Sequence, residues 1–252
     1  MPRDDLGTEI PLTAPARRIV SLVPSLTEAL ATSAPDRLVG ATDWCTHPAD
    51  LDVPRVRGTK NPDLAAVRAI GPDLVVANQE ENRELDVRRL RDSGVAVWVT
   101  RIETVDEALA SMGRLLAEAL DLAEPGWLTE ARRLWSVPAP VRLRVAVPIW
   151  RDPWMVVGGR TYTHDVLARA GLANVMARHQ GRYPSVEVED IEAAGPDVVL
   201  LPDEPYVFTA DDGPDAFSVP TELVSGRLLT WYGPAMVETH AMLAGMVDSL
   251  QP

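Results

Sequence analysis

The sequence predicts an α/β protein of two lobes with mainly parallel sheets, and three observations support this. The tripeptide Gly-Pro-Asp occurs at 71–73 and again at 195–197, which is 124 residues later in a chain of 252. Each copy follows a short amphipathic segment and precedes an apolar, β-rich run. Glycine ends a helix in the left-handed conformation and proline prevents its continuation. Each copy therefore predicts helix, tight turn and buried strand.

Before residue 104, apolar β-branched runs alternate with amphipathic segments. This alternation predicts a parallel sheet with right-handed crossovers. The string Ser25-Leu26-Thr27-Glu28 has the spacing of a helix capping box. The segment 43–61 is irregular and fits either a functional loop or a connector. We expect strands at 18–23, 38–42, 74–77 and 95–100, and helices at 26–32, 64–70 and 84–92.

The rest of the chain predicts a second lobe behind connecting helices. A capping box at 104–107 opens one helix, and Pro125 opens another that runs to Trp135. Gly158-Gly159 suits a hairpin turn, and the alternative is that it allows close backbone approach. We expect strands at 143–149, 198–201 and 228–231, helices at 161–170, 188–194 and 235–250, and a polar surface loop at 205–221. The predicted domains are 17–103 and 141–252, joined by 104–140.

Composition limits the possible partners. A net charge of −13 disfavours nucleic acid and anionic membranes, and no apolar run approaches the roughly 20 residues of a membrane span. Residues 1–16 contain acidic side chains and no apolar core, so they are not a signal peptide. We expect a cytoplasmic protein as written, or an exported one whose signal was removed. Cys45 is the only cysteine, which excludes an internal disulfide. We expect a monomer without a cofactor.

Aromatic residues make up only 5% of the chain, yet they gather after predicted strands. Ligands of open α/β sheets bind outside the carboxyl ends of the strands. Tryptophan and tyrosine at such positions suit a flat, apolar ligand held between two lobes. The alternative is that these rings cap the core or the lobe interface. The candidates are Trp44, Trp150, Tyr183, Trp231 and Tyr232.

Polar candidates lie beside these aromatics. Arg151 sits between two tryptophans, where it could stack on them, fork a ligand carboxylate, or form a salt bridge near Asp152. Asn78 and Glu80 follow the strand of the first repeat. Lys60 is the only lysine, which is either chance or a need for a compact ammonium group.

No pattern indicates catalysis. Cys45 and His47 are neighbours in a loop, which is a weak signal for a nucleophile and base, and the four histidines lack metal-ligand spacing. The chain has no P-loop, no G-x-S-x-G and no dinucleotide fingerprint. We expect neither a catalytic residue nor a metal site. Glu84 and its acidic neighbours near a helix start are stabilising there without any partner.

Several strings resemble the iron-siderophore and cobalamin periplasmic-binding family. These are Arg18-Ile19-Val20-Ser21-Leu22-Val23-Pro24-Ser25-Leu26-Thr27-Glu28, then Val39-Gly40 with Trp44 and Pro48, and then Gly71-Pro72-Asp73-Leu74-Val75-Val76-Ala77. The resemblance covers about residues 17–250. It implies a substrate-binding protein of an ABC importer, in which a helical spine joins two lobes and the ligand lies in the cleft between them.

The resemblance also implies roles for single residues. Trp44 and Tyr183 match aromatic ligand contacts of the cobalamin-binding member, and Trp231 and Tyr232 fall in its last cleft loop. Glu84 and Glu189 match two acidic residues, one on each lobe, that dock on arginines of the permease.

We therefore expect a protein that binds a metal-chelate small molecule without making or breaking bonds. A corrinoid is the first choice of ligand, and haem or a ferric siderophore follows. The alternative is a cytoplasmic enzyme or metallocofactor chaperone on the same fold.

Overall fold

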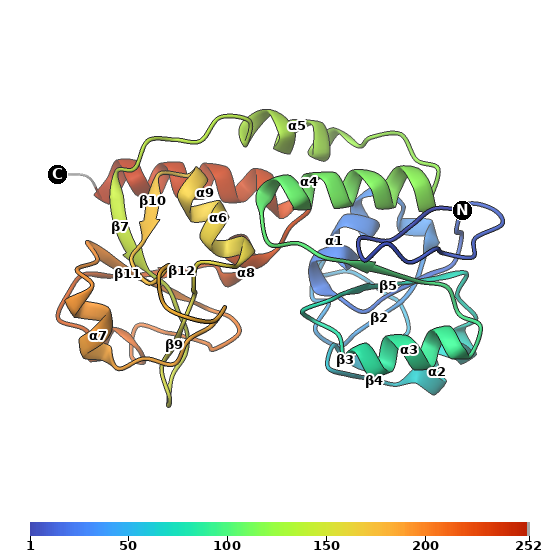
Figure 1. Ribbon diagram of the computed structural model, residues 1–252, viewed down its shortest axis with the longest axis horizontal. Coiled ribbons are helices and arrows are strands. Elements are labelled where there is room, and N and C mark those ends of the chain that lie inside the picture. The colour runs from blue at the N-terminus through green and yellow to red at the C-terminus, as the bar shows by residue number, and fades with distance from the viewer. Residues whose placement is uncertain (251–252) are drawn as a thin grey trace. The chain divides into compact units, whose positions relative to one another are not determined.

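A computed structural model describes residues 1–250 (Figure 1). The chain divides into two compact units. Lobe 1 comprises residues 1–102, 106–131 and 232–234, and lobe 2 comprises 103–105, 132–231 and the chain from 235 onward. The predicted connecting region 104–140 contains helix α4 (Val105–Arg114), its π-helical continuation η2 (Leu115–Ala119) and helix α5 (Gly126–Leu134). No helix within residues 1–250 is both long and apolar enough to cross a membrane.

Lobe 1 is built on the parallel sheet that the sequence predicts. Its strands have the order β2-β1-β5-β6, and all neighbouring pairs are parallel. Apolar side chains of these strands are buried because helices cover both faces of the sheet. The strands are β1 (Ile19–Ser21), β2 (Leu38–Ala41), β5 (Leu74–Asn78) and β6 (Val97–Thr100).

Lobe 2 repeats this topology. Its strands have the order β10-β7-β11-β12, again with parallel neighbours. Each lobe therefore places its first strand second in the sheet, beside the strand that follows Gly-Pro-Asp. The sequence did not predict β10 or β12, and the predicted strand 143–149 is interrupted after Ala146. The strands are β7 (Leu143–Ala146), β10 (Leu172–Asn174), β11 (Val198–Pro202) and β12 (Thr221–Val224).

The two Gly-Pro-Asp turns are equivalent in structure as well as in sequence. Gly71 and Gly195 are left-handed, with φ of 67° and 68°. In lobe 1, Asp73 Oδ2 accepts a hydrogen bond from the Arg18 amide at 3.0 Å, while the Asp73 amide donates to the Arg18 carbonyl at 2.8 Å.

Lobe 2 forms the same pair of bonds, between Asp197 and Arg144, at 2.7 Å and 2.8 Å. The guanidinium of each arginine also donates to the carbonyls that end the preceding helix, Ile70 in lobe 1 and Ala194 in lobe 2. The aspartate thus joins the repeated strand to its neighbour in both lobes.

The helices of lobe 1 lie on both faces of its sheet (Figure 1). Val67 of α2 (Leu64–Ile70) and Leu90 of α3 (Glu84–Asp92) enter a core with residues of β1, β5 and β6. Gly71 ends α2 as predicted, and Asp63 caps its start by accepting from the Ala65 and Ala66 amides, both at 3.0 Å. The other helices before α4 are α1 (Pro24–Ser33) and the short 3₁₀ helix η1 (Pro35–Arg37).

One predicted cap in this lobe is wrong. Helix α1 begins at Pro24, its N-cap is Val23, and no side chain caps it. Ser25 therefore lies inside the helix, where it is buried with Thr27. The start moves two residues earlier, from 26 to Pro24, because proline is favoured at the first helical position, where its missing N–H costs nothing.

Lobe 2 has helices α6 (Tyr162–Arg169), α7 (Val188–Ala193), α8 (Gly226–Thr230) and α9 (Ala235–Leu250), with a 3₁₀ turn η3 (Pro214–Ala216). The predicted strand 228–231 is wrong, because Ser225 caps α8 by accepting from the Leu228 amide. A four-residue segment with three apolar residues is too short to show a period by which strand and helix can be told apart. Tertiary packing decides such a segment, and here it buries Leu229 on a helix.

Two short hairpins extend from the lobes. Strands β3 (Arg57–Gly58) and β4 (Asn61–Pro62) pair within the predicted irregular segment. Strands β8 (Pro148–Trp150) and β9 (Met155–Val156) pair after β7. Gly158 and Gly159 lie beyond this hairpin, so they do not form its turn.

The alternative prediction for these glycines, close backbone approach, is confirmed. A Cβ added to Gly158 would lie 2.5 Å from the Gly181 carbonyl oxygen, and one on Gly159 would overlap the Ala177 carbonyl. The Gly158 amide donates to the Arg182 carbonyl at 2.7 Å. The loop that carries Tyr183 is thereby packed against the backbone that leads into α6.

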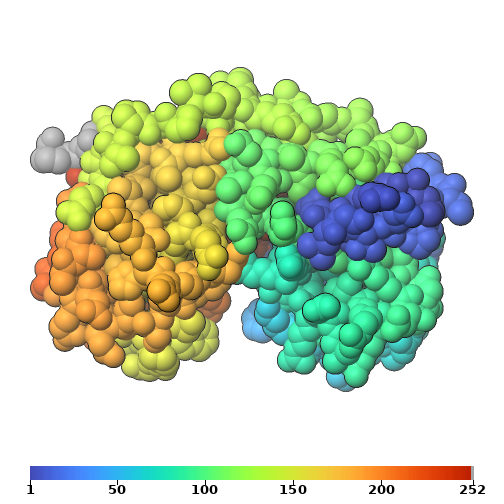
Figure 2. Space-filling view, viewed as in Figure 1, coloured from blue at the N-terminus to red at the C-terminus, as the bar shows by residue number. Residues whose placement is uncertain are grey.

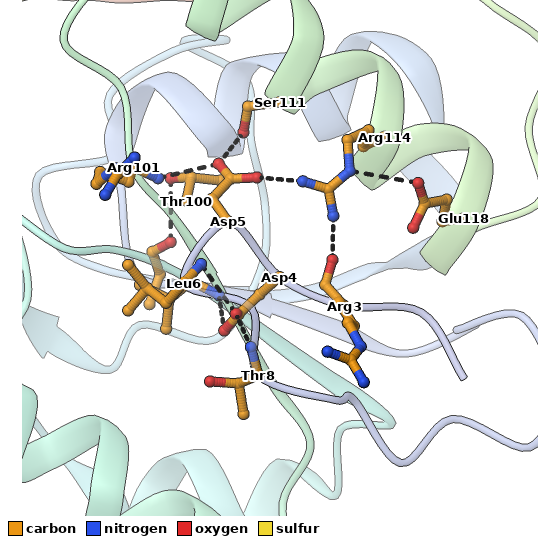
Figure 3. A network of polar contacts seen from close by, with 12 residues as sticks. Arg3, Asp4, Asp5, Leu6, Thr8, Thr100, Arg101, Ser111, Arg114 and Glu118 are labelled. Atoms are coloured by element: carbon orange, nitrogen blue, oxygen red, sulfur yellow. Dashed lines mark hydrogen bonds and ion pairs between the residues drawn. The ribbon is translucent and has the colours of Figure 1, made fainter.

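The N-terminal segment is an ordered part of lobe 1 (Figure 2, dark blue). Asp4 is buried, and its carboxylate pairs with Arg91 at 2.7 Å. Asp5 accepts from Ser111 Oγ at 2.6 Å and pairs with Arg114 at 2.9 Å (Figure 3). The Asp5 amide donates to the Val99 carbonyl of β6 at 3.2 Å. The segment therefore covers the edge strand of the sheet, whose unpaired backbone groups would otherwise be exposed.

Candidate functional site

Loops at the carboxyl ends of the lobe-1 strands bring together several predicted residues. Trp44 follows β2 and is 67% exposed, a large fraction for an indole. A Cβ added to Gly58 would lie 3.3 Å from Trp44 Nε1, so the indole lies beside the β3–β4 hairpin. That hairpin carries Lys60 at its turn. Trp44 and Lys60 thus belong to one surface of lobe 1.

The loop after β5 meets the same hairpin. The Lys60 ammonium donates to the Glu80 carbonyl oxygen. Asn82 donates to the Thr59 carbonyl at 2.9 Å, and its side-chain oxygen accepts from the Asn78 amide at 2.9 Å. The sequence predictions for Lys60 and Glu80 therefore converge on two loops in direct contact.

Asn78 has a positioning role in this loop. Its side chain is buried, and its Oδ1 accepts from the Glu80 amide at 2.8 Å and the Glu81 amide at 3.2 Å. Its Nδ2 donates to Thr100 Oγ1 at 3.1 Å. These bonds hold the backbone of the two glutamates at the end of the strand. Asn78 thus supports the loop, and its contact with the ligand stays a prediction.

Glu81 is a residue that the sequence analysis did not single out. Its side chain is half-buried, and burial raises the pKa of its carboxyl group, the Lys60 ammonium lowers it, and Glu80 raises it again. Glu81 directly follows Glu80, whose carbonyl oxygen accepts from the Lys60 ammonium. Only its position next to Glu80 could have indicated this, and consecutive glutamates are common on protein surfaces.

Tyr232 belongs to lobe 1 and its side chain is buried. Burial raises the pKa of its hydroxyl, and the charges of Glu81 and Glu80 act in the same direction. We call Trp44, Lys60, Glu80 and Glu81 the lobe-1 surface.

The lobe-2 candidates lie on the β8–β9 hairpin and its neighbours. Trp150 is 43% exposed and meets Tyr206 edge-on, with ring centroids 5.6 Å apart. The Tyr206 hydroxyl donates to Asp212 Oδ2 at 2.6 Å, and this bond raises the pKa of Tyr206. Trp150 is therefore an exposed indole that a second ring supports from one side.

Arg151 is held by residues far along the chain. Its guanidinium lies over the Trp154 ring, 5.6 Å from the centroid, as the predicted stacking requires. It also pairs with Asp212, and with Asp215 at 3.5 Å. The predicted salt bridge near Asp152 is the long one, at 3.9 Å. Two carboxylates of the protein already engage the Arg151 guanidinium. The structure therefore favours the predicted salt bridge over the alternative, a bidentate contact of Arg151 with a ligand carboxylate.

The last two aromatics differ from the exposed pair. Tyr183 is half-buried in the loop that packs against Gly158. Trp231 is buried and is the C-cap of α8, with Arg227 over its ring at 6.0 Å. Since α8 is a helix, the argument that Trp231 follows a strand no longer holds. Trp231 and Tyr183 remain predicted ligand contacts on the resemblance alone.

The two predicted docking carboxylates share one local setting. Glu84 lies in the first turn of α3 and Glu189 in the first turn of α7, and both are exposed. Within the part of the chain that the structure describes, neither has a hydrogen bond or ion pair to its side chain. By contrast, nearby Glu192 accepts from the Ser218 amide and hydroxyl.

Cys45 does not have the setting of a nucleophile. It is buried, and its sulfur contacts Thr27 Oγ1 at 2.9 Å and Thr42 Oγ1 at 3.1 Å. Burial raises the pKa of the thiol, which disfavours the reactive thiolate. Over residues 1–250, no three His, Cys, Asp or Glu side chains gather as a metal site.

Known proteins of similar sequence are vitamin B12-binding proteins. The one from Salmonella typhimurium is 28% identical over 194 residues, which cover 74% of this chain and 72% of that protein. No protein-family model matches the sequence.

Solved structures of similar fold are periplasmic binding proteins. The vitamin B12-binding protein of Vibrio cholerae has a TM-score of 0.75 at 19% identity, covering 94% of this chain and 98% of that one. A heme-binding protein from Pseudomonas aeruginosa has a TM-score of 0.74 at 24% identity, covering 94% of each chain. These findings confirm the two-lobed α/β fold and the resemblance to periplasmic binding proteins, among them proteins that bind vitamin B12 and heme.

Proposed function

We propose that this protein is the substrate-binding component of an ABC importer and that its ligand is a corrinoid, with haem or a ferric siderophore as the next candidates. The similarity to vitamin B12-binding proteins along 74% of the chain supports the corrinoid. The similarity of fold to heme-binding proteins keeps haem as the second choice. The protein would act as a monomer that binds its ligand without chemical change.

The observation that carries this proposal is the exposure of Trp44 and Trp150. Each follows the first or second strand of its own lobe, and each leaves a large part of its indole in solvent, 67% and 43%. An indole that is exposed to this degree leaves its apolar ring available to a ligand. A flat macrocycle offers the area and the π-face that such rings bind best.

The experiment is a titration of the purified protein with hydroxocobalamin, hemin and a ferric siderophore. Visible absorbance and quenching of tryptophan fluorescence report binding. We expect hydroxocobalamin to bind in the micromolar range or tighter. The corrinoid assignment fails if only hemin or the siderophore binds, and the binding function fails if none of the three binds.

Single alanine variants locate the site. Trp44→Ala and Trp150→Ala should each weaken corrinoid binding about tenfold, which corresponds to about 1.4 kcal/mol. The matched control is Trp127→Ala, because Trp127 lies in α5 and donates to Ser33 at 2.9 Å. Equal losses in all three variants would indicate a general effect on folding and would contradict the assignment of the two indoles.

We further propose that Glu84 and Glu189 dock on arginines of the permease. Helix N-termini stabilise acidic side chains without a partner, but neither carboxylate is engaged within the described residues. Charged pairs of this kind orient association and weaken with salt. The double variant Glu84→Gln/Glu189→Gln should keep corrinoid affinity and lose binding to permease in nanodiscs. The control Asp92→Asn/Glu222→Gln removes the same charge from exposed positions. The docking proposal fails if both double variants bind the permease equally.

A further inference from the structure

A single carboxylate of lobe 2 holds two neighbours of the exposed Trp150 indole. Asp212 Oδ2 accepts from the Tyr206 hydroxyl at 2.6 Å, and Asp212 Oδ1 accepts from the Arg151 guanidinium. The Tyr206 ring meets the Trp150 ring edge-on, with centroids 5.6 Å apart and an angle of 78° between the ring planes. Arg151 is the residue that directly follows Trp150 in the chain. Asp212 therefore bonds both the side chain that supports the indole in space and the one next to it in sequence.

These two supports are themselves anchored in the core of lobe 2. The Arg151 guanidinium lies over the Trp154 ring. Trp154 is buried and stacks on Phe208, which is also buried, with centroids 5.8 Å apart and ring planes within 6° of parallel. Phe208 in turn contacts the Tyr206 ring, with centroids 4.7 Å apart. Aromatic pairs at such distances attract each other beyond the burial of their area, so Asp212 closes a ring of contacts that starts and ends at the core.

The segments that Asp212 joins leave the lobe-2 sheet at the end where ligands of such folds bind. Strands β7 and β11 are parallel neighbours. The β8–β9 hairpin, which carries Trp150, follows β7, and the loop that carries Asp212 follows β11. Ligands of open α/β sheets bind outside the carboxyl ends of the strands. Asp212 thus acts at this end of the sheet, beside the indole that is the proposed ligand contact of lobe 2.

A purely stabilising role explains this carboxylate poorly. The side chain of Asp212 is 39% exposed, and ion pairs of exposed carboxylates contribute little to the stability of a fold. The same contacts have a large effect on order, because they restrict a hairpin turn and an aromatic ring that would otherwise move independently. What they order is the surroundings of Trp150.

We propose that Asp212 is a positioning residue, which fixes the Trp150 indole in the orientation in which it meets the ligand. It acts through the Tyr206 ring and through Arg151. A side chain that loses its rotamer freedom only when the ligand binds weakens binding, and a protein that fixes the side chain beforehand avoids this cost. The inference rests on the proposed function, in which Trp150 contacts the ligand. It assigns a role to a loop that the sequence predicts only as a polar surface.

Titration of variants with hydroxocobalamin tests the effect on affinity. Asp212→Ala should weaken binding about threefold to tenfold, the range expected when one ordered side chain becomes mobile. Tyr206→Phe keeps the ring and removes only its hydrogen bond to Asp212, so it should weaken binding by a smaller factor. It also provides a readout if Asp212→Ala does not fold. The matched control is Asp211→Ala, because Asp211 is exposed and its side chain has no hydrogen bond or ion pair to any residue between 1 and 250.

A double-mutant cycle separates positioning from a general effect on the fold. In the Trp150→Ala background, Asp212→Ala should cause little further loss, since the indole that Asp212 positions is already absent. A residue that acts on the fold, or on the ligand directly, would weaken binding by the same factor in both backgrounds.

Fluorine NMR of protein labelled with 5-fluorotryptophan reports the indole without any ligand. The Trp150 resonance is assigned by its absence in Trp150→Phe. We expect it to shift or broaden in Asp212→Ala and in Tyr206→Phe, and to stay unchanged in Asp211→Ala. Resonances of Trp44, Trp98 and Trp127, which belong to lobe 1, should not move in any of these variants.

The outcomes separate this inference from the function on which it rests. If Asp212→Ala binds hydroxocobalamin as tightly as wild type, if its loss recurs in full in the Trp150→Ala background, or if the Trp150 resonance is unchanged, positioning by Asp212 is overturned while the corrinoid function stands. If wild type binds neither hydroxocobalamin nor hemin nor the ferric siderophore, the function itself is wrong and the inference falls with it.

Discussion

Replacing Asp4 should destabilise lobe 1 far more than its place near the chain start suggests. Its carboxylate is fully buried and pairs with Arg91, whose side chain is 29% exposed, at 2.7 Å. Its other oxygen accepts from the Leu6 amide at 3.0 Å and the Thr8 amide at 2.8 Å (Figure 3). Removing the carboxylate takes an acceptor from the Leu6 and Thr8 amides, from the Arg91 guanidinium and, at 3.4 Å, from the Val99 amide.

The magnitude follows from these contacts. Each amide that loses its acceptor costs roughly 1 kcal/mol. Loss of the ion pair adds about 1 kcal/mol, less than for a fully buried pair, because Arg91 can be rehydrated. Asp4→Ala should therefore lower the free energy of unfolding by about 3 kcal/mol. Asp4→Asn keeps an acceptor for the amides and should cost only about 1 kcal/mol.

Urea denaturation followed by circular dichroism measures the difference, and hydrogen exchange of β6 amides reports the local effect. Glu9→Ala is the control, since its pair with Arg3 at 2.7 Å is largely exposed and contributes about 0–1 kcal/mol. If Asp4→Ala lies within about 0.5 kcal/mol of wild type, or if β6 exchange is unchanged, the N-terminal segment does not stabilise the sheet edge and the reasoning is refuted.

Three further predictions concern single positions. Gly158→Ala should destabilise lobe 2 by roughly 1–3 kcal/mol in thermal unfolding, since its Cβ would meet the Gly181 carbonyl oxygen at 2.5 Å. The control Gly126→Ala adds a Cβ with nothing within 4 Å and should be neutral or stabilising. Equal unfolding midpoints for the two variants would contradict this prediction. Cys45 should react with Ellman's reagent only on unfolding, because burial raises its pKa, and fast labelling of native protein would show an accessible thiol instead. The hydrogen bond from the Ala66 amide lowers the pKa of Asp63 in the folded protein. The stability that this carboxylate contributes is therefore present above its unfolded-state pKa and is lost as pH falls through its folded-state pKa. Asp63→Asn should flatten the decline of protein stability below about pH 4, and an unchanged stability profile would exclude the contribution.

Part of the site could be predicted because its residues follow strands. The first Gly-Pro-Asp motif locates strand β5. Asn78 ends this strand and Glu80 follows it, so both lie at the carboxyl end of β5. Trp44 is found in the same way from β2. What these side chains do there could not be predicted, since Asn78 turns inward to hold the loop and Trp44 remains exposed.

The sequence by itself determined the repeat, the α/β fold class and the alternation of helices and strands that predicts a parallel sheet. These depend on signals that act over a few residues: glycine at a positive φ, proline at a helix start, and apolar periodicity. They succeed at Gly71 and Gly195, which are left-handed as predicted. They fail at 228–231, where a short, mostly apolar segment fits a strand or a helix equally well.

Only the tertiary structure decided which charges meet. Arg151 pairs with Asp212 and Asp215, about 60 positions later, and Lys60 bonds the backbone of Glu80 from another loop. Which loops come together depends on strand order and on close contacts such as that of Gly158 with Gly181. No local sequence pattern predicts these contacts, because the energy of an ion pair depends on the distance between the two charges in space and not on their separation along the chain.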